Sequence, residues 1–297
     1  MGFAKMVKPK YPPRLWTLAG FPGSGKSTFA AQMRPPLLAI DADRRFAEVL
    51  GMARGEVYSI GETAADNANT EKIVALLKAN MPGSDVNTIV VDSLSAVISP
   101  LVTQAILDND AGRNRNRAAA FKNKALAMRQ LQDAVTCWGK DVLWIYHFKE
   151  GRDGQGSKVI RPTVPETELE RLKRSINLQL EIVQDGEKRG IKVVWARQGC
   201  QQITLWDETG RWLGMPERVE AAVYGNLPEP AKAETVIPKQ FTNIDAALEW
   251  GISQGVFPDA ASARRAYDEI KQKNKPKAAA EMASYWTVEV LHRRKSS

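Results

Sequence analysis

The sequence predicts an α/β fold in which helices cover both faces of a mostly parallel central sheet, followed by a small helical module at the C-terminus. Short apolar runs alternate with helix-like segments from Leu15 onward, and this alternation is typical of parallel strands buried on both faces. Later runs follow one another closely, which indicates an antiparallel extension of the sheet. Three helix-like segments after residue 240 predict the separate module.

The expected elements of the core follow in chain order. The strands contain the runs LWTLAG, LLAIDAD, TIVVDS, DVLWIYHF, LQLEIVQ, IKVVWAR and QITLWDE. A helix is predicted to open at Lys26, an Ala-rich amphipathic stretch follows the second run, and a long polar helical region covers residues 103–138. In the module, Asn243 or Asp245, and then Asp259 or Ser262, are suitable helix caps.

Changes in composition divide the chain into four parts. Residues 1–14 contain basic residues and prolines without an acid and predict a flexible basic arm, with a solvated tail as the alternative. Residues 15–226 form the expected core, and residues 227–240, which contain three prolines and no hydrophobic period, predict a linker. The small basic helical domain covers residues 241–297, and its positive charge either contacts nucleic acid or lies on a solvated helix face.

The overall composition is that of an ordinary globular protein, since 43% of the 297 residues are hydrophobic and 26% are charged. The 42 Lys and Arg residues outnumber the 34 Asp and Glu residues, so the surface is expected to attract polyanions such as nucleic acid. Two cysteines without metal-ligand spacing and two histidines exclude the usual structural zinc site. No apolar run approaches the roughly 20 residues of a transmembrane helix, so we expect a soluble cytoplasmic protein with reduced thiols.

A glycine-rich segment follows the first expected strand and opens the first expected helix. It matches the P-loop pattern GxxxxGK[ST], in which glycines let the backbone turn its N–H groups toward phosphates. Lys26 is expected to reach the β- and γ-phosphates, and Ser27 to supply a hydroxyl ligand to Mg²⁺. The sequence therefore predicts binding of ATP and Mg²⁺ by Gly20, Gly23, Ser24, Gly25, Lys26, Ser27 and Thr28.

Acidic residues end two of the expected buried strands. Asp92 ends the run TIVVD and is predicted to hold the magnesium shell, as a P-loop requires. The alternative for Asp92 is an ordinary strand-ending residue that caps the next helix. Asp41 and Asp43 lie at the end of the run LLAIDAD, where a carboxylate could orient the water that attacks the γ-phosphate.

The order of these motifs resembles the RecA-type recombinase ATPases. The run IDAD, followed by VVDS, is similar to the segments in which those proteins carry a catalytic Glu and the Walker B Asp. The resemblance implies a RecA-like P-loop NTPase fold and assigns the water-orienting role to Asp43, with Asp41 as the alternative because Asp is one methylene shorter than Glu. The run WIYHFKEG is similar to RadA-like branches and implies that His147 senses the γ-phosphate; a hydrogen-bonded structural histidine is the alternative.

The same resemblance implies two DNA-facing segments, one after the Walker B strand and one after the sensor strand. The first is basic, without an acid between Ala111 and Gln132, and either neutralises phosphates without reading sequence or forms a solvated helix. The second, residues 151–158 and on to Arg161, is glycine-rich and is expected to be a mobile loop that orders on DNA. The expected DNA-binding residues are Arg113, Arg115, Arg117, Lys122, Lys158 and Arg161, and Lys124 and Arg129 belong to the same basic cluster.

RecA-type ATPases act as oligomers, so the resemblance implies a homo-oligomeric ring or filament. RadA-like relatives complete the site of a neighbouring subunit with a basic residue, and Arg197 in IKVVWARQG occupies the similar position. A local ion pair is the alternative role for Arg197.

The short core, without a large N-terminal domain, resembles phage single-strand-annealing ATPases of the Sak type and related phage AAA ATPases. This implies a DNA-stimulated ATPase that binds single-stranded DNA, promotes annealing or strand exchange, and works with a single-stranded-DNA-binding protein in the cytoplasm of a bacterial host. One alternative is a small-molecule or nucleotide kinase, with the Arg113–Arg117 cluster as a lid over the phosphates. The other is an ATP-regulated adaptor or loader that acts on a replication or recombination partner.

Overall fold

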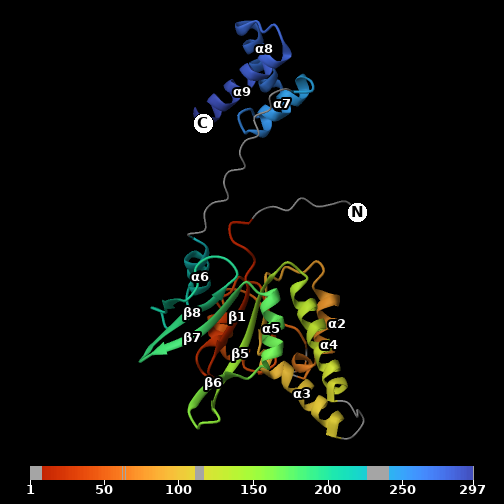
Figure 1. Ribbon diagram of the computed structural model, residues 1–297, viewed down its shortest axis with the longest axis vertical. Coiled ribbons are helices and arrows are strands. Elements are labelled where there is room, and N and C mark those ends of the chain that lie inside the picture. The colour runs from red at the N-terminus through yellow and green to blue at the C-terminus, as the bar shows by residue number, and fades with distance from the viewer. Residues whose placement is uncertain (1–8, 62, 64, 111–116, 226–240, 297) are drawn as a thin grey trace. The chain divides into compact units, whose positions relative to one another are not determined.

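A computed structural model describes residues 9–61, 63, 65–110, 117–225 and 241–296 (Figure 1). The chain forms two compact units, Met1–Leu227 and Pro228–Ser297, and each is described by itself. The predicted linker, residues 227–240, and the first eight residues of the predicted basic arm lie outside the described residues.

The first unit is built on one sheet with the strand order β3-β2-β4-β5-β1-β7-β8-β9, and β6 pairs with β5. From β7 through β1, β5, β4 and β2 to β3, each strand runs parallel to its neighbour. The antiparallel pairs are β6 with β5, β8 with β7 and β9 with β8. The predicted α/β core with a mostly parallel sheet, followed by C-terminal helices, is confirmed. The strands are β1 (Leu15–Gly20), β2 (Leu37–Asp41), β3 (Val57–Ser59), β4 (Thr88–Asp92), β5 (Asp141–Arg152), β6 (Lys158–Pro162), β7 (Leu178–Asp185), β8 (Lys188–Ala196) and β9 (Ile203–Trp206).

Helices cover both faces of this sheet with two separate apolar clusters. Apolar side chains of α2, α3, α4 and α5 pack on one face, and those of α1, α6 and the 3-10 segment η1 pack on the other. Figure 1 shows α2, α4 and α5 on the same side of the sheet. The helical segments are α1 (Lys26–Ala30), η1 (Phe46–Met52), η2 (Asp66–Ala68), α2 (Thr70–Asn80), α3 (Leu94–Asp110), α4 (Arg117–Thr136), α5 (Glu166–Ser175) and α6 (Met215–Tyr224).

The carboxyl ends of the central strands meet at one edge of the sheet. Asp41 of β2 lies in register with Asp92 of β4, and Gly20 of β1 lies in register with His147 of β5. Because parallel strands run in the same direction, the polar residues that end each apolar run gather where the P-loop begins. This edge carries the candidate site.

Two segments differ from the expectation. The helical region predicted at residues 103–138 is two helices, α3 and α4. The glycine-rich segment predicted to be a loop at residues 151–158 is a β-hairpin, because β5 continues to Arg152 and β6 begins at Lys158. The β-branched Val159 and Ile160 pair across the hairpin with β5, as suits their strand propensity, and Asp153 caps the turn by accepting from two backbone N–H groups.

The second unit contains three helices in its described part, α7 (Ile244–Ser253), α8 (Ala260–Asn274) and α9 (Ala279–Ser296). Asn243 and Asp259 cap the first two, each by accepting a backbone N–H in the first turn. The core is built around the buried Trp286, which stacks on Phe257 with 5.4 Å between ring centroids and donates its indole N–H to the Ala247 carbonyl. This unit therefore has an apolar core of its own.

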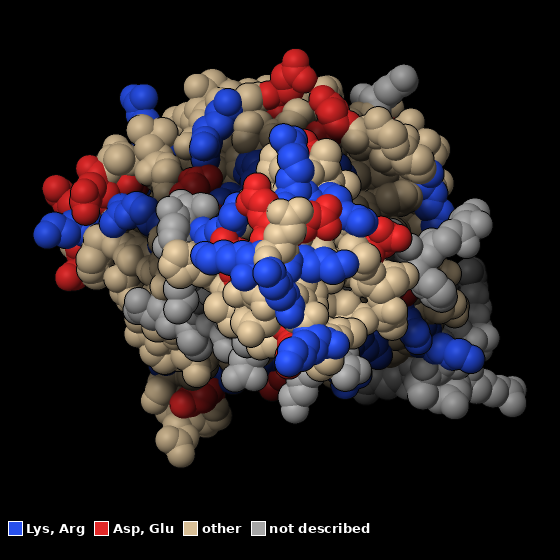
Figure 2. Space-filling view, turned by 90° about the horizontal axis from the view of Figure 1, so that it is seen from above, with Lys and Arg blue, Asp and Glu red and all other residues tan. Residues whose placement is uncertain are grey.

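Basic side chains are prominent on this unit. An exposed lysine cluster spans the last turn of α8 and the turn that follows, and its members are Lys271, Lys273, Lys275 and Lys277. Figure 2 shows Lys and Arg side chains concentrated around a smaller acidic group on the face that it views. None of the described helices is both long enough and apolar enough to cross a membrane.

Candidate nucleotide site

The glycine-rich loop between β1 and α1 has the backbone conformation that a phosphate-binding loop needs. Gly23 and Gly25 have φ angles of 76° and 94°, which is the left-handed region that favours glycine. A Cβ added at Gly25 would lie 2.9 Å from the indole nitrogen of Trp212, so a side chain there would also collide with a buried ring. The loop can therefore turn its backbone N–H groups toward one anionic group.

Lys26 lies over this loop. Its side chain is buried, and its Nζ donates to the carbonyl oxygens of Gly20 at 3.1 Å and Phe21 at 2.7 Å. Burial lowers the pKa of Lys26 to about 8, and the negative charges of Asp92 and Asp43 limit that decrease. The ammonium group is therefore poised next to the loop, where an incoming phosphate would stabilise its charged form.

Ser27 and Asp92 together provide a hydroxyl and a carboxylate side by side. The Ser27 Oγ donates to Asp92 Oδ2 at 2.5 Å. Burial raises the pKa of Asp92 to about 6, and the nearby charges of Asp43 and Asp41 act in the same direction. Among the described residues no group of three or more His, Cys, Asp or Glu side chains could hold a metal ion. A Mg²⁺ ion at Ser27 and Asp92 would accordingly depend on nucleotide oxygens and water for its other ligands.

The two carboxylates at the end of β2 have different partners. Asp41 accepts backbone N–H groups from Arg45 and Phe46, at 3.0 and 2.9 Å, so its side chain fixes the start of η1. Asp43 faces the P-loop cavity, where its Oδ2 lies 2.8 Å from His147 Nε2. Burial opposes ionisation of Asp43, but hydrogen bonds from His147 and Ser93 and the nearby positive charges outweigh it and lower the pKa of Asp43.

His147 comes from the last sheet position of β5 before the β5–β6 hairpin. Its backbone N–H donates to Ser95 Oγ at 3.2 Å, and Ser95 Oγ lies 2.6 Å from Thr163 Oγ1. The other ring nitrogen, Nδ1, is buried without a hydrogen-bond partner among the described residues. His147 therefore connects Asp43 to the segment that follows the hairpin.

These side chains line one cavity of about 490 Å³, a size within the range of small-molecule sites. The structure brings Asp43, Asp92 and His147 together around it with five predicted P-loop residues, Gly23, Gly25, Lys26, Ser27 and Thr28, whereas Gly20 and Ser24 do not line it. Sequence reasoning missed three further lining residues that follow the IDAD run: Arg45, which precedes η1, and Glu48 and Val49 on η1.

The expected DNA-binding residues lie in two places. Lys158 and Arg161 are on β6, where they pair across the hairpin with Arg152 and Lys149 of β5; Lys158 also forms an exposed ion pair with Glu150. Lys122 is exposed on α4 and Arg117 begins that helix, whereas Arg113 and Arg115 lie outside the described residues.

Lys124 does not belong to an exposed basic cluster. Its side chain is 8% exposed and its Nζ lies 3.0 Å from the carboxylate of Glu168, which is 1% exposed. Arg171 also approaches Glu168. A buried carboxylate needs a paired charge. Lys124 therefore pairs with Glu168 and connects α4 to α5, and the expectation that it neutralises phosphates is wrong.

Arg197 lies just after β8, and its guanidinium group donates to the carbonyls of Arg174 and Ile176 at the end of α5. These bonds satisfy carbonyl groups that a helix end leaves without partners. Arg197 is not among the residues that line the cavity of its own chain, and its action on a neighbouring subunit stays a prediction.

Comparison with known proteins adds the following findings. A family model described as "AAA domain" matches residues 13–212. No curated protein matches the sequence significantly. Among solved structures the chain is similar to the RadB recombinase, with 17% sequence identity and a TM-score of 0.42 over 68% of this chain and 90% of the RadB chain.

Proposed function

This chain belongs to the AAA domain family, and from that premise we propose that it is an ATPase that binds single-stranded DNA and promotes annealing or strand exchange. The observation that carries the proposal is the continuity of β5. One strand positions His147 against Asp43 in the nucleotide cavity and then continues as the basic β5–β6 hairpin. A change at the nucleotide can therefore reach the hairpin through a single strand.

In the nucleotide site, the backbone of the P-loop would hold the phosphates of ATP and Lys26 would neutralise the β- and γ-phosphates. Ser27 and Asp92 fit a Mg²⁺ ion because their hard oxygen atoms already lie in contact. When bound, Mg²⁺ would stabilise charge that develops on the phosphate oxygens. The proposed binding residues are Gly20, Gly23, Ser24, Gly25, Lys26, Ser27 and Thr28, with Asp92 at the metal.

Asp43 is the proposed group that orients the attacking water. Its hydrogen bond to His147 fixes the carboxylate at the cavity, and its lowered pKa keeps it ionised near neutral pH. A carboxylate held in this way accepts a hydrogen bond from water in a defined direction. His147 is then able to report the presence of the γ-phosphate, because it touches the same carboxylate and lies next to the hairpin.

The proposed DNA contacts are phosphate contacts. Lys158 and Arg161 on the hairpin and Lys122 and Arg117 on α4 would neutralise backbone charge without reading sequence, together with Arg113 and Arg115. ATP would favour the arrangement that binds DNA, and hydrolysis through Asp43 would release it. We extend the proposal to a homo-oligomeric ring or filament, with Arg197 acting on the neighbouring subunit and a single-stranded-DNA-binding protein as partner.

The first experiment is the steady-state ATPase rate of the full chain with and without single-stranded DNA, at low and moderate salt. We expect stimulation by single strands that weakens as salt rises, and loss of turnover in Lys26→Ala. Lys78→Ala is the matched control, because Lys78 is exposed at the end of α2. A rate that is indifferent to DNA, with no salt-dependent binding, would contradict the recombination function.

Other outcomes of the same experiment separate the two alternatives. ATP consumption that requires an added acceptor molecule would identify a kinase. DNA function that Lys26→Ala retains in full would identify an adaptor that uses ATP for regulation only.

A further inference from the structure

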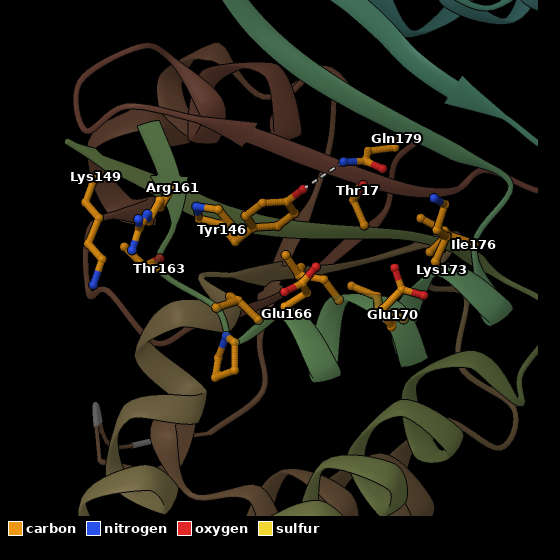
Figure 3. A pocket seen from close by; sticks show the side chains of 15 residues that line it. Thr17, Tyr146, Lys149, Arg161, Thr163, Glu166, Glu170, Lys173, Ile176 and Gln179 are labelled. Atoms are coloured by element: carbon orange, nitrogen blue, oxygen red, sulfur yellow. Dashed lines mark hydrogen bonds between the residues drawn. The ribbon is translucent and has the colours of Figure 1, made fainter. Parts of the chain in front are cut away.

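A second cavity lies between the sheet and α5, and we call it the α5 groove (Figure 3). Its volume is about 790 Å³. β1, β5 and β7 contribute its floor, and α5 with the segment that leads into it contributes the facing wall. It shares no lining residue with the nucleotide cavity, so the proposed ATPase chemistry does not account for it.

The floor of the groove offers a fixed set of polar atoms. Gln179 Nε2 donates to the Tyr146 hydroxyl at 3.4 Å, and Figure 3 shows both side chains beside Thr17. Thr17 is 2% exposed, and its hydroxyl lies next to the Tyr146 hydroxyl. The floor therefore presents hydroxyl and amide groups side by side, which suits a ligand with a polar edge.

The wall and the rim have different character. Pro162, Leu169 and Leu172 give the wall apolar surface. Lys149 and Arg161, which are paired across the hairpin, lie together at one end of the groove in Figure 3, and Glu166 and Glu170 of α5 face the floor. Lys173 lies at the opposite end, beside Ile176. The groove therefore combines an apolar wall, hydrogen-bonding groups on the floor, carboxylates along one side and cations at both ends.

We propose that the α5 groove receives one unstacked nucleobase of the single strand whose phosphates the hairpin holds; this inference rests on the proposed function. A nucleobase is neutral and planar, with apolar faces for the wall and a polar edge for the floor. Lys149 and Arg161 would hold the flanking phosphates, because they lie at the end of the groove that adjoins the hairpin. The carboxylates of Glu166 and Glu170 accept hydrogen bonds, which favours bases with an exocyclic amine (adenine, cytosine and guanine) over thymine, which has none.

The test compares binding of the full chain, in the presence of a non-hydrolysable ATP analogue, to an ordinary single-stranded oligonucleotide and to one of equal length that carries abasic sites. The two probes have the same phosphates, so a difference in their affinities reports the contribution of the bases alone. We expect the abasic probe to bind about 5- to 150-fold more weakly, the range produced by loss of one stacked base. Among ordinary probes, oligo(dC) should bind more tightly than oligo(dT).

Near-isosteric variants then locate the effect. Gln179→Leu and Thr17→Val should weaken binding of the ordinary probe, leave the abasic probe unaffected and leave the salt dependence unchanged. Gln130→Leu on the exposed side of α4 is the matched control and should change neither probe. Thermal unfolding of each variant checks that the core is intact, since Thr17 and Tyr146 are buried.

The possible failures are distinguishable. Salt-dependent binding that is equal for the ordinary and abasic probes overturns the nucleobase site and leaves the proposed function standing. Absence of any binding to single strands contradicts both. If the groove variants leave DNA binding intact but shift the sedimentation of the chain toward smaller species, the groove is a contact between copies of this chain and the nucleobase assignment is wrong.

Discussion

The pH dependence of ATP turnover follows from two buried groups of opposite charge type. Burial lowers the pKa of Lys26 to about 8 and raises that of Asp92 to about 6. The nucleotide needs Lys26 charged and the metal needs Asp92 ionised, so the productive form exists between the two values. We therefore expect kcat/KM, which reports the free protein, to have a maximum near neutral pH.

The size of the effect comes from the same two values. At pH 9 about a tenth of Lys26 is charged and at pH 5 about a tenth of Asp92 is ionised, so kcat/KM should fall roughly tenfold from its maximum to either pH. The assay is initial-rate ATPase in overlapping buffers of constant ionic strength, with saturating Mg²⁺. The kcat/KM profile should therefore fall on both sides of its maximum. Loss of the Lys26 proton lowers kcat/KM as pH rises, and protonation of Asp92 lowers it as pH falls.

One variant assigns the alkaline limb to Lys26. Lys26→Arg keeps a positive charge throughout this pH range, so its residual activity should lose the alkaline limb and keep the acidic one. A wild-type profile of kcat/KM that stays flat from pH 7 to 9.5 would refute the reasoning, because it would mean that Lys26 of the free protein stays charged throughout that range.

Three further predictions concern separate parts of the first unit. Asp43→Asn should lower ATP turnover by about 10²- to 10⁴-fold without weakening nucleotide binding, measured by single-turnover kinetics beside equilibrium binding. Arg14→Ala should lower the free energy of unfolding in urea by about 3–5 kcal/mol, because Arg14 and Glu220 are a buried pair 2.6 Å apart; replacing both residues by apolar ones should cost less. Lys158→Gln should reduce the slope of log binding constant against log salt by about 0.7 for single-stranded DNA, whereas Lys78→Gln, the control, should leave it unchanged.

The parts of the site that could be predicted from the sequence are those fixed by local pattern and strand direction. The P-loop glycines are identifiable because only glycine readily adopts the φ angles at Gly23 and Gly25. Asp92 and His147 each end an apolar run, and parallel strands bring such ends to one edge of a sheet. No knowledge of distant contacts is needed for either inference.

The parts that could not be predicted depend on contacts between distant segments. Lys124 belongs to a basic run in the sequence, and its burial is decided by Glu168 on another helix. Which of Asp41 and Asp43 lines the cavity depends on where the chain turns after β2, since the Asp41 side chain accepts backbone N–H groups of Arg45 and Phe46. Arg197 similarly takes its partners from the end of α5.

A contact between two phenylalanines connects the nucleotide to the hairpin. The Phe21 carbonyl accepts from Lys26 Nζ, and the Phe21 ring packs edge-on against Phe148 with 6.0 Å between centroids. A phosphate that binds Lys26 competes for its three N–H donors, so we expect the restraint on the loop beside Phe148 to weaken when ATP binds. Coupling between two sites is reciprocal in binding free energy, and we therefore expect ATP to tighten DNA binding by the same factor by which DNA tightens ATP binding.

This reciprocity gives a prediction for Phe148. Phe148→Leu keeps an apolar side chain at the base of the hairpin but shortens the contact with Phe21, so both factors should decrease together while ATPase activity without DNA is retained. The measurement is a thermodynamic cycle of four dissociation constants, for ATP with and without DNA and for DNA with and without ATP, in wild type and variant. A variant that keeps the wild-type coupling factor would show that the Phe21–Phe148 contact does not carry the signal, and would direct attention to the contact between His147 and Asp43.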